Sequence, residues 1–436
     1  MIARQMLALV VPLGARSSPL MGRHWCDSAE PATFWSSRVL VLCVCLLTAT
    51  WAWAQDPVID VGTIAPTAED QGEVPFPWVN FGDALGISGS TAMAGMPLLE
   101  RGKVGVYELS SEGWQRTATL VGSKAGDSEF GTALDLDGNV AAISSPHMLY
   151  FFKRKRSQWR ELAHAQLPAD MQFSRSLAHE GGYIAVGVTP TDPNTPAPGA
   201  VHIYRYQHGN PRLQKVATLR SRDCIEGDGF GASVAMEHRL LVVGAPGSCG
   251  EGGTGAAYVF IRVRDGWFKL DKLMPSDAYP GGGFGTGLAI RKGAIVIGAP
   301  NVDTPENETL APEGAAYVFL LSRRGWFESQ KLNTGSAPPG FFGTRIAMAR
   351  GLVAISAPLD VAARWGMGRL IIYDWVGREL QFGRSVFQFE GLVGIGLDAS
   401  GRRVIVNAQA VPPNVEVQNG YAHIFTFGTV PGSAEP

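Results

Sequence analysis

Short apolar runs separated by turn residues make up most of the chain after residue 80. A typical unit begins with a Phe-Gly pair, continues into a short strand and a tight turn, and then enters an apolar run such as Ala294–Ile297. Third runs follow at Gly255–Phe260 and Gly314–Phe319, which both read GAAYVF, and a fourth run carries a tryptophan. Ser-Gly and Asp-Gly pairs at the first turn are typical of β-hairpins. The pattern therefore predicts four antiparallel strands in each unit.

These units recur in a fixed phase along the chain. In five of them a proline lies 16 residues after the aromatic residue of the Phe-Gly pair. Four strands per repeat, with successive Phe-Gly pairs separated by 43 to 58 residues, are typical of β-propeller blades. We therefore predict an all-β fold, a seven-bladed β-propeller with four-stranded antiparallel blades. The seven starting points are Phe81-Gly82, Phe130-Gly131, Phe173-Ser174, Phe230-Gly231, Phe284-Gly285, Phe342-Gly343 and Val393-Gly394.

The last unit lacks a fourth strand. It provides strands up to Tyr421–Phe427, and the chain stops at Pro436. An unassigned β-like stretch, Val58–Ile64, precedes the first Phe-Gly pair. We predict that this stretch completes the last blade and closes the ring, so that residues 55–436 form a single domain.

Residues 1–54 have the features of an export signal. Val39–Thr50 is almost wholly apolar, follows a basic residue and is followed by an A-x-A site at 52–54, which predicts cleavage before Gln55. The run is shorter than the ~20 residues that a membrane-spanning helix needs. An uncleaved anchor is the alternative, and a start at Met21 would give a signal of more ordinary length. We therefore expect a periplasmic, cell-surface or extracellular protein.

Composition and charge exclude two classes of protein. The chain is 45% hydrophobic and only 17% charged, which is enough apolar material for a core and argues against general disorder. Its formal net charge of −2 lacks the basic excess of a general nucleic-acid binder. We expect no nucleic-acid partner.

The order FG, GAP, GAAYVF, W and KL at residues 230–273 and 284–332 resembles the FG-GAP repeats of the integrin α-subunit propeller, in their bacterial form. The resemblance extends over the mature chain and implies a seven-bladed propeller with a binding or adhesion role. Calcium loops of such units are not carried over, because Asp135–Gly138 lacks a third ligand and the length to surround the ion. We interpret that segment as a turn and expect no metal and no cofactor.

Other sequence signals do not indicate an enzyme. Gly250–Gly255 fits G-x-G-x-x-G, but it lies between two strands and does not open a helix, so we interpret it as a loop. No serine-hydrolase, zinc-protease or phosphate-loop motif occurs. The recurring tryptophans, and His202 and His423 at matching places in third strands, are interpreted as packing residues.

Strand alternation assigns the connections to two sides of the ring. The turns between strands one and two and between three and four lie on what we call the short-turn side. The other connections, several of them longer, lie on the long-loop side, where recognition usually occurs. Cys224 and Cys249 both fall there, and we predict a disulfide between them. Lys153–Arg156 and other basic residues mark the short-turn side. The candidate partner-binding residues, all acidic and all on the long-loop side, are Asp192, Asp223, Glu226, Asp228, Glu251, Asp303, Glu306, Glu308 and Glu313.

The sequence supports an exported, non-catalytic, monomeric binding or adhesion propeller that recognises an unknown protein or glycan through the long-loop side. The basic short-turn side would rest against a phosphate-rich envelope surface by screened attraction. Simple solubility is the other explanation of the charges. Two further functions stay open, namely an enzyme (hydrolase or lyase) with a site assembled from loops of several blades, and a passive envelope scaffold.

Overall fold

The described residues form β-strands and no α-helix. None of them forms a helix with the length and apolar character that crossing a bilayer requires. The computed structural model describes residues 59–67, 81–192, 199–223, 227–247, 253–264, 266–303, 312–333, 340–360, 367–386, 392–409 and 420–428.

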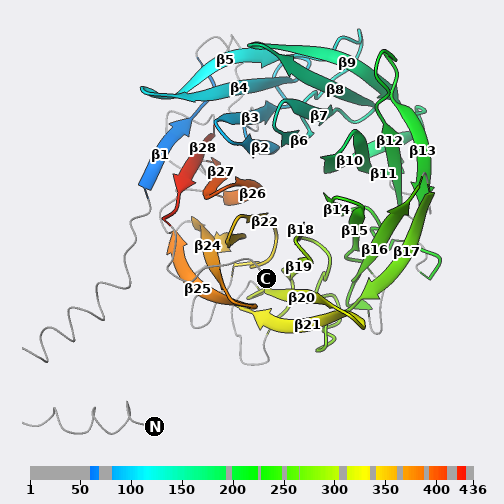
Figure 1. Ribbon diagram of the computed structural model, residues 1–436, viewed down its shortest axis with the longest axis vertical. Coiled ribbons are helices and arrows are strands. Elements are labelled where there is room, and N and C mark those ends of the chain that lie inside the picture. Colours follow the sequence, from blue (N-terminus) through cyan, green and yellow to red (C-terminus); the bar gives the residue numbers. More distant parts are fainter. Residues whose placement is uncertain are drawn as a thin grey trace, which may run out of the picture. The chain divides into compact units, whose positions relative to one another are not determined.

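The strands build seven four-stranded antiparallel sheets, which are the blades of a ring around a central axis (Figure 1). The innermost strands are β2 (Leu85–Ser88), β6 (Ala133–Asp137), β10 (Met171–Glu180), β14 (Ser233–Glu237), β18 (Leu288–Arg291), β22 (Ile346–Ala349) and β26 (Leu392–Ser400). The second strands are β3 (Thr91–Met96), β7 (Val140–Ser144), β11 (Tyr183–Pro190), β15 (Leu240–Ala245), β19 (Ala294–Ala299), β23 (Leu352–Asp360) and β27 (Arg403–Gln409). The third strands are β4 (Lys103–Ser110), β8 (Met148–Lys155), β12 (Ala200–Arg205), β16 (Ala256–Val263), β20 (Ala315–Ser322), β24 (Met367–Val376) and β28 (Tyr421–Thr426). The outermost strands are β5 (Gly113–Leu120), β9 (Gln158–Gln166), β13 (Gln214–Leu219), β17 (Gly266–Leu273), β21 (Gly325–Leu332), β25 (Glu379–Val386) and β1 (Ile59–Ile64).

This arrangement confirms the predicted all-β, seven-bladed fold, including the way the ring closes. Strand β1 pairs antiparallel with β28, with Ile59 opposite Thr426 and Ile64 opposite Ala422. The first strand among the described residues is therefore the outermost strand of the last blade. Hydrogen bonds between β1 and β28 join the two ends of the described domain within one blade and so hold the ring shut.

The hydrophobic core lies between the blades, not within them. Each of the seven core clusters combines residues from two neighbouring blades. In one of them Phe284 and Trp326 of the fifth blade pack with Val242 and Val259 of the fourth. Trp114, Trp159 and Trp267 occupy equivalent places, which confirms the packing interpretation of the repeated tryptophans. The stability of each blade thus depends on its neighbours.

Two motif glycines fit against each other across a blade interface. Gly343, from the Phe-Gly pair of the sixth blade, has a φ of 96°, which favours glycine. A Cβ atom on Gly298, from the Gly-Ala-Pro triplet of the fifth blade, would lie 1.9 Å from the Gly343 carbonyl oxygen. Only glycine allows that approach. The repeated FG and GAP signals therefore mark the backbone contact between consecutive blades.

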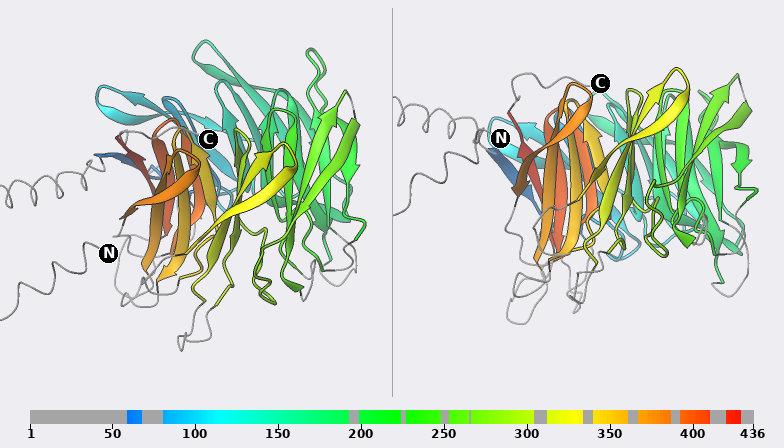
Figure 2. Two further views of the ribbon diagram at one scale, coloured as in Figure 1. Left: turned by 60° about the horizontal axis from the view of Figure 1, so that its bottom comes forward. Right: turned by 90° about the horizontal axis from the view of Figure 1, so that it is seen from below.

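The strands run between the two sides of the ring (Figure 2). The outer hairpins, such as β20–β21 and β24–β25, turn at one side, which is the short-turn side. The innermost strands begin at the opposite, long-loop side. Residues 300–314 connect β19 to β20 on that side, whereas residues 292–293 connect β18 to β19 on the short-turn side. This difference in length places the longer connections on one side of the rigid ring.

Candidate functional site

A central cavity of about 150 Å³ opens where the seven innermost strands begin. Residues two to four positions after the first residue of each Phe-Gly pair, or of its weaker copy, line the cavity, so every blade contributes to it. Because the innermost strands start at the long-loop side, the cavity belongs to that side. We call it the central cavity.

Three charged side chains from three blades meet at the central cavity. Asp83 precedes β2, Arg175 lies in β10, and Arg345 directly precedes β22. Arg175 Nη1 lies 3.2 Å from Asp83 Oδ2, and the side chain of Arg175 is 56% exposed while that of Asp83 is only 5% exposed. Among the described residues that line the cavity, two are therefore cationic and one is anionic.

Local backbone structure explains how both arginines are held. Arg175 lies in a β-bulge, since the register of β10 against β11 shifts between Phe173 and Leu177. Bulges commonly redirect a side chain. The backbone N–H of Arg345 donates to Ser356 Oγ at 3.1 Å, and that hydroxyl donates to the Gly394 carbonyl oxygen of the next blade at 3.0 Å.

Hydroxyl side chains form much of the remaining rim. Thr132 Oγ1 donates to the Glu129 carbonyl oxygen at 2.6 Å, and Thr286 Oγ1 donates to the Gly283 carbonyl oxygen at 2.7 Å. These bonds fix the turns that enter the innermost strands. The rim is thus held by its own backbone contacts, which makes the cavity a largely preformed feature.

Electrostatics distinguish Arg345 from an ordinary surface arginine. Burial lowers the pKa of Arg345, the neighbouring Arg175 lowers it further, and Asp83 opposes both effects. A lowered pKa means that the positive charge is less well stabilised here than in water.

Farther along the same strands, toward the short-turn side, carboxyl groups join neighbouring blades. Asp135 Oδ2 accepts a hydrogen bond from the backbone N–H of His179 at 2.6 Å, and Asp398 Oδ2 accepts one from the backbone N–H of Ile87 at 2.7 Å. Burial raises the pKa of Asp135 to about 6. Burial and the charge of Asp135 raise the pKa of Asp398 to about 7. These two groups tie strands together.

His179 is the residue whose backbone N–H donates to Asp135. Its ring packs against Phe151 at 5.6 Å between centroids, and neither ring nitrogen has a hydrogen-bond partner. Burial lowers its pKa to about 4. The side chain is therefore a neutral packing residue at neutral pH, which is the common state of a buried histidine.

The predicted acidic residues occupy several different environments. Asp192 is exposed, and Asp303 and Glu313 are half-buried. Asp228 is 1% exposed, accepts from the Phe230 backbone N–H at 2.9 Å and from Ser221 Oγ at 3.1 Å, and so organises the entry to its blade. The calls that lie outside the described residues are Glu226, Glu251, Glu306, Glu308 and the disulfide between Cys224 and Cys249.

Asp223 belongs to a contact that repeats in two blades. Lys272 Nζ lies 2.7 Å from Asp223 Oδ2 and 5.5 Å from the centroid of the Tyr258 ring. Burial alone would raise the pKa of Asp223, but the hydrogen bond from Lys272 lowers it below its ordinary value. In the next blade Asp277, Lys331 and Tyr317 form the same arrangement. Asp223 and Asp277 therefore attach interblade connections to the blades that follow them.

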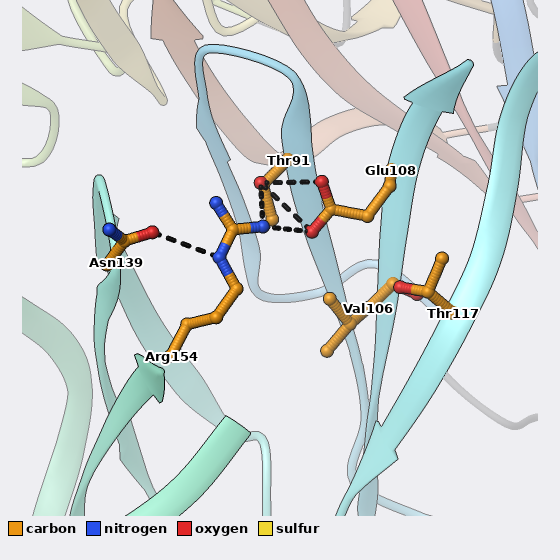
Figure 3. Close-up of polar contacts among 6 residues, drawn as sticks. All are labelled: Thr91, Val106, Glu108, Thr117, Asn139 and Arg154. Atoms are coloured by element: carbon orange, nitrogen blue, oxygen red, sulfur yellow. Dashed lines mark hydrogen bonds and ion pairs between the residues drawn. The ribbon is translucent and has the colours of Figure 1, made fainter. Parts of the chain in front are cut away.

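On the short-turn side, too, some charged side chains form contacts within the fold (Figure 3). Arg154, from the basic run Lys153–Arg156, forms an ion pair with Glu108 of the first blade and donates to Asn139 Oδ1 at 3.0 Å. It also donates to Thr91 Oγ1 at 3.1 Å, and its guanidinium lies 5.7 Å from the centroid of the Trp159 ring. Arg154 thus links two blades, whereas its neighbours Lys153, Lys155 and Arg156 are exposed.

The sequence analysis did not select Asp83, Arg175 or Arg345. A position-by-position alignment of the seven units contains the signal. Three residues after the first motif residue, the other six units carry Ala, Ser or Gly where the sixth unit carries Arg345. One position earlier, Asp83 and Arg175 stand where the remaining units carry Thr, Ala or Ile. What the alignment cannot supply is that these three positions face one another.

The segment Asp135–Gly138, which we interpreted as a turn, forms the end of β6 and the turn into β7, with Asp137 opposite Val140. Among the described residues, no group of three or more His, Cys, Asp or Glu side chains is arranged to hold a metal ion.

Comparison with known families supports the repeat assignment. The model of the FG-GAP repeat matches residues 213–260 and 267–319. Each match begins near the outermost strand of one blade and ends within the third strand of the next, the same offset by which β1 completes the last blade. Together with the seven-bladed ring, these matches decide the family. The chain is an FG-GAP repeat β-propeller.

No curated protein matches the sequence of this FG-GAP propeller. Solved structures with a similar chain include a Saccharomyces cerevisiae complex of a Dbp5 variant with Nup159, a Gle1 variant, IP6 and ADP. That likeness has a TM-score of 0.46 and 11% identity and covers 85% of this chain and 95% of that chain. Saccharomyces cerevisiae Sqt1 is similar with a TM-score of 0.45 and 10% identity over 85% of this chain and 98% of that chain. Neither likeness carries functional information.

Proposed function

We propose that this FG-GAP propeller is an exported, non-catalytic binding protein that recognises a protein or a glycan through its long-loop side. The FG-GAP propeller fold suggests a binding or adhesion-type role. The export, the partner class and the face are our proposals, and the N-terminal signal pattern supports the first of them.

The difference between the two sides of the ring is the observation that carries this proposal. On the short-turn side, connections such as 238–239, 292–293 and 323–324 are only long enough to reverse the chain. On the long-loop side, β19 ends at Ala299 and β20 begins only at Ala315, and β27 ends at Gln409 and β28 begins only at Tyr421. Chain that exceeds what the fold needs, placed on a rigid scaffold, is where binding residues usually occur.

The side that binds can be tested by charge reversal. Asp192, Glu251, Glu306 and Glu308 would be changed together to lysine, leaving out Asp223 and Asp228 because both make contacts within the fold. The matched control carries Lys155→Glu and Arg323→Glu on the short-turn side, where both residues are exposed. We expect labelled residues 55–436 to bind the host's envelope fraction saturably in low and high salt, and the loop variant to lose that binding.

Two outcomes would overturn the binding proposal. If the short-turn control abolishes binding and the loop variant does not, attachment occurs through the basic side and is electrostatic. If residues 55–436 turn over an ester or polysaccharide panel, the protein is an enzyme. Export is tested separately by the mass of the secreted chain, which we expect to begin at Gln55.

A further inference from the structure

We propose that a groove on the short-turn side binds a free aliphatic acid, with its alkyl chain between the fourth and fifth blades and its carboxylate at Arg239 and Arg262. We call it the hairpin groove, because the outer hairpins β16–β17 and β20–β21 contribute to its walls. Its volume of about 700 Å³ lies within the range of ~300–1,000 Å³ that is usual for ligand pockets. The proposal goes beyond the binding function above, which concerns the opposite side of the ring.

The first support is the apolar lining between the two blades. Leu240 and Ile261, which lie opposite each other in β15 and β16, line the groove from the fourth blade together with Leu270. Leu321 and Trp326, which lie opposite each other in β20 and β21, line it from the fifth blade. Leu270 is 52% exposed and Leu321 is 44% exposed. An alkyl chain placed here would remove apolar surface from water, which is favourable by about 25 cal/mol per Å².

The second support is a comparison of equivalent positions at different blade interfaces. The positions are the first residue of the second strand, the third-strand residue opposite it and, in the following blade, the next-to-last residue of the third strand with the tryptophan opposite it. Between the first and second blades they hold Thr91, Glu108, Arg154 and Trp159. Arg154 crosses this interface, where it donates to Thr91 and pairs with Glu108 (Figure 3).

An arginine also crosses between the third and fourth blades. There the guanidinium of Arg262 lies 4.1 Å from the centroid of the Tyr183 ring. At the hairpin groove the equivalent residue is Leu321, and the residues that face it from the fourth blade are Leu240 and Ile261. The groove therefore lies where an arginine crosses at the two other interfaces.

The third support is the position of Leu270. It is the extra residue of a β-bulge, where the register of β16 against β17 shifts. At the corresponding bulge of the fifth blade, Ser329 Oγ donates to the Val318 carbonyl oxygen at 3.1 Å, and at that of the first blade Thr117 is bonded to Val106 in the same way. Leucine cannot form this hydrogen bond. Its side chain lines the groove instead.

The fourth support is the basic end of the groove. Arg239, in the turn between β14 and β15, and Arg262 line it beside the third-blade turn at Glu180. The Oε2 atom of Glu180 is buried, whereas Arg239 is exposed and would meet a ligand first. A guanidinium that contacts an aromatic ring, as Arg262 does, still has N–H donors that match the two oxygens of a carboxylate. An apolar end and a basic end together match an acid with an alkyl chain.

The test uses residues 55–436 and titration calorimetry at pH 7, with decanoate below the concentration at which it forms micelles. Acetate is the comparator that has the head group without the chain. Decyltrimethylammonium is the comparator that has the chain with the opposite charge. We expect decanoate to bind, acetate not to bind, and decyltrimethylammonium to bind roughly tenfold more weakly than decanoate.

Leu321→Arg separates insertion of a chain from simple attraction between charges. It gives the fifth blade the residue found at Arg154 and Arg262, so it should fill the groove and weaken decanoate binding roughly tenfold or more. Attachment by charge alone would become stronger, because the variant adds a positive charge. The matched control is Leu98→Arg, which makes the same change at a leucine that is 49% exposed on the long-loop side. It should leave the affinity unchanged.

Two further variants test the two ends of the groove separately. Leu270→Thr places there the residue type of Thr117 and should weaken decanoate binding roughly threefold. Arg239→Gln should weaken decanoate binding by a similar factor without weakening the binding of decyltrimethylammonium. Both positions are exposed, so neither change removes a core side chain. Thermal unfolding of each variant shows that it is folded.

Several results would overturn the proposal. They are no decanoate binding at millimolar concentration, acetate binding as tightly as decanoate, or equal affinities in Leu321→Arg and Leu98→Arg. Vesicles of phosphatidylcholine and phosphatidylglycerol give the remaining test. If they bind the protein in a way that Leu321→Arg abolishes, and decanoate does not bind, the groove contacts a bilayer and not a free acid.

The outcome is independent of the proposed function, because the hairpin groove and the long loops lie on opposite sides of the ring. Envelope capture without decanoate binding would remove the groove as a site and leave the binding function standing. The charge-reversed loop variant should lose envelope capture and still bind decanoate with unchanged affinity.

Discussion

At the long-loop side the innermost strands present Arg175 and Arg345 to the central cavity, whereas toward the short-turn side the same strands carry Asp135 and Asp398. The two carboxyl groups accept hydrogen bonds from the backbone of a neighbouring blade, and so their position is explained by the fold. At the cavity Arg175 pairs with Asp83, and Arg345 lies near both of them. The two ends of the innermost strands therefore differ, because buried carboxyl groups join blades at one end and a cavity with two arginines opens at the other.

The largest effect is expected at the carboxyl groups that join the blades. It is tested by a substitution at Asp398 that removes the ionisable group and keeps an oxygen that accepts a hydrogen bond. In the folded state the pKa of Asp398 is raised to about 7, so the native chain binds the proton more tightly than the unfolded chain does. Its contribution to the free energy of unfolding therefore falls as the pH rises from about 4 to 7. Asp398→Asn should stabilise the protein at pH 8 by roughly 1–3 kcal/mol and hardly at all at pH 4.

Denaturant unfolding of both proteins at pH 4 and pH 8 measures this difference. A gain of equal size at both pH values would mean that Asp398 is not protonated preferentially in the native state. Arg350→Gln, an exposed position outside both the central cavity and the hydrogen bonds of Asp135 and Asp398, serves as the reference variant.

The next largest effect on stability is expected when the acceptor oxygen of Asp398 is removed. At pH 5 the carboxyl of Asp398 is largely protonated, so its charge no longer opposes folding, but its oxygen still accepts from the Ile87 backbone N–H. Asp398→Ala leaves that N–H without its partner and should cost about 1–2 kcal/mol at pH 5. A cost at pH 5 no larger than that of Arg350→Gln would show that the hydrogen bond from Ile87 to Asp398 does not stabilise the ring.

His179 gives a pH dependence of the opposite sign. Its pKa is lowered to about 4 in the native state, so the unfolded chain binds the proton more tightly and stability falls as the pH drops from 6.5 toward 4. His179→Leu should remove about 1 kcal/mol of that loss between pH 7 and pH 5. Parallel unfolding curves of the variant and the native chain across this range would show that His179 does not titrate there.

The smallest effect should come from the short-turn side. Arg154→Ala removes the ion pair with Glu108 and the contact with Trp159, and it should cost about 0.5–1 kcal/mol at low salt and less in high salt. Lys155→Ala, an exposed neighbour in the same run, should cost less. If the two variants are equal, Arg154 does not link the first two blades measurably.

The strand order, the number of blades and the closing strand were predictable from the chain alone. Each depends on short-range patterns, namely the Phe-Gly phase, the turn residues and an unassigned stretch at Val58–Ile64 that matches a missing strand. The packing role of the tryptophans was predictable for the same reason. A residue that recurs at the same position of several units is expected to have a structural role that is common to those units.

The candidate site was harder to predict because it depends on the exceptions to the repeat. Acidic residues on the long-loop side were easy to collect, yet Asp223 pairs with Lys272 and Asp228 supports its own turn. The number of charged residues on each side of the ring does not show which of them form contacts within the fold. Arg175 and Arg345 are 170 positions apart in the chain, and no local pattern connects them.

The sequence by itself determined the blades, because strand periodicity, turn chemistry and glycine requirements act over a few residues and repeat in each unit. Only the tertiary structure decided which side chains face one another at the axis. Closing seven similar units into a ring brings the same position of every unit to one point, so a single unusual residue in one blade meets a single unusual residue in another. The charge of the central cavity is therefore a property of the closed ring.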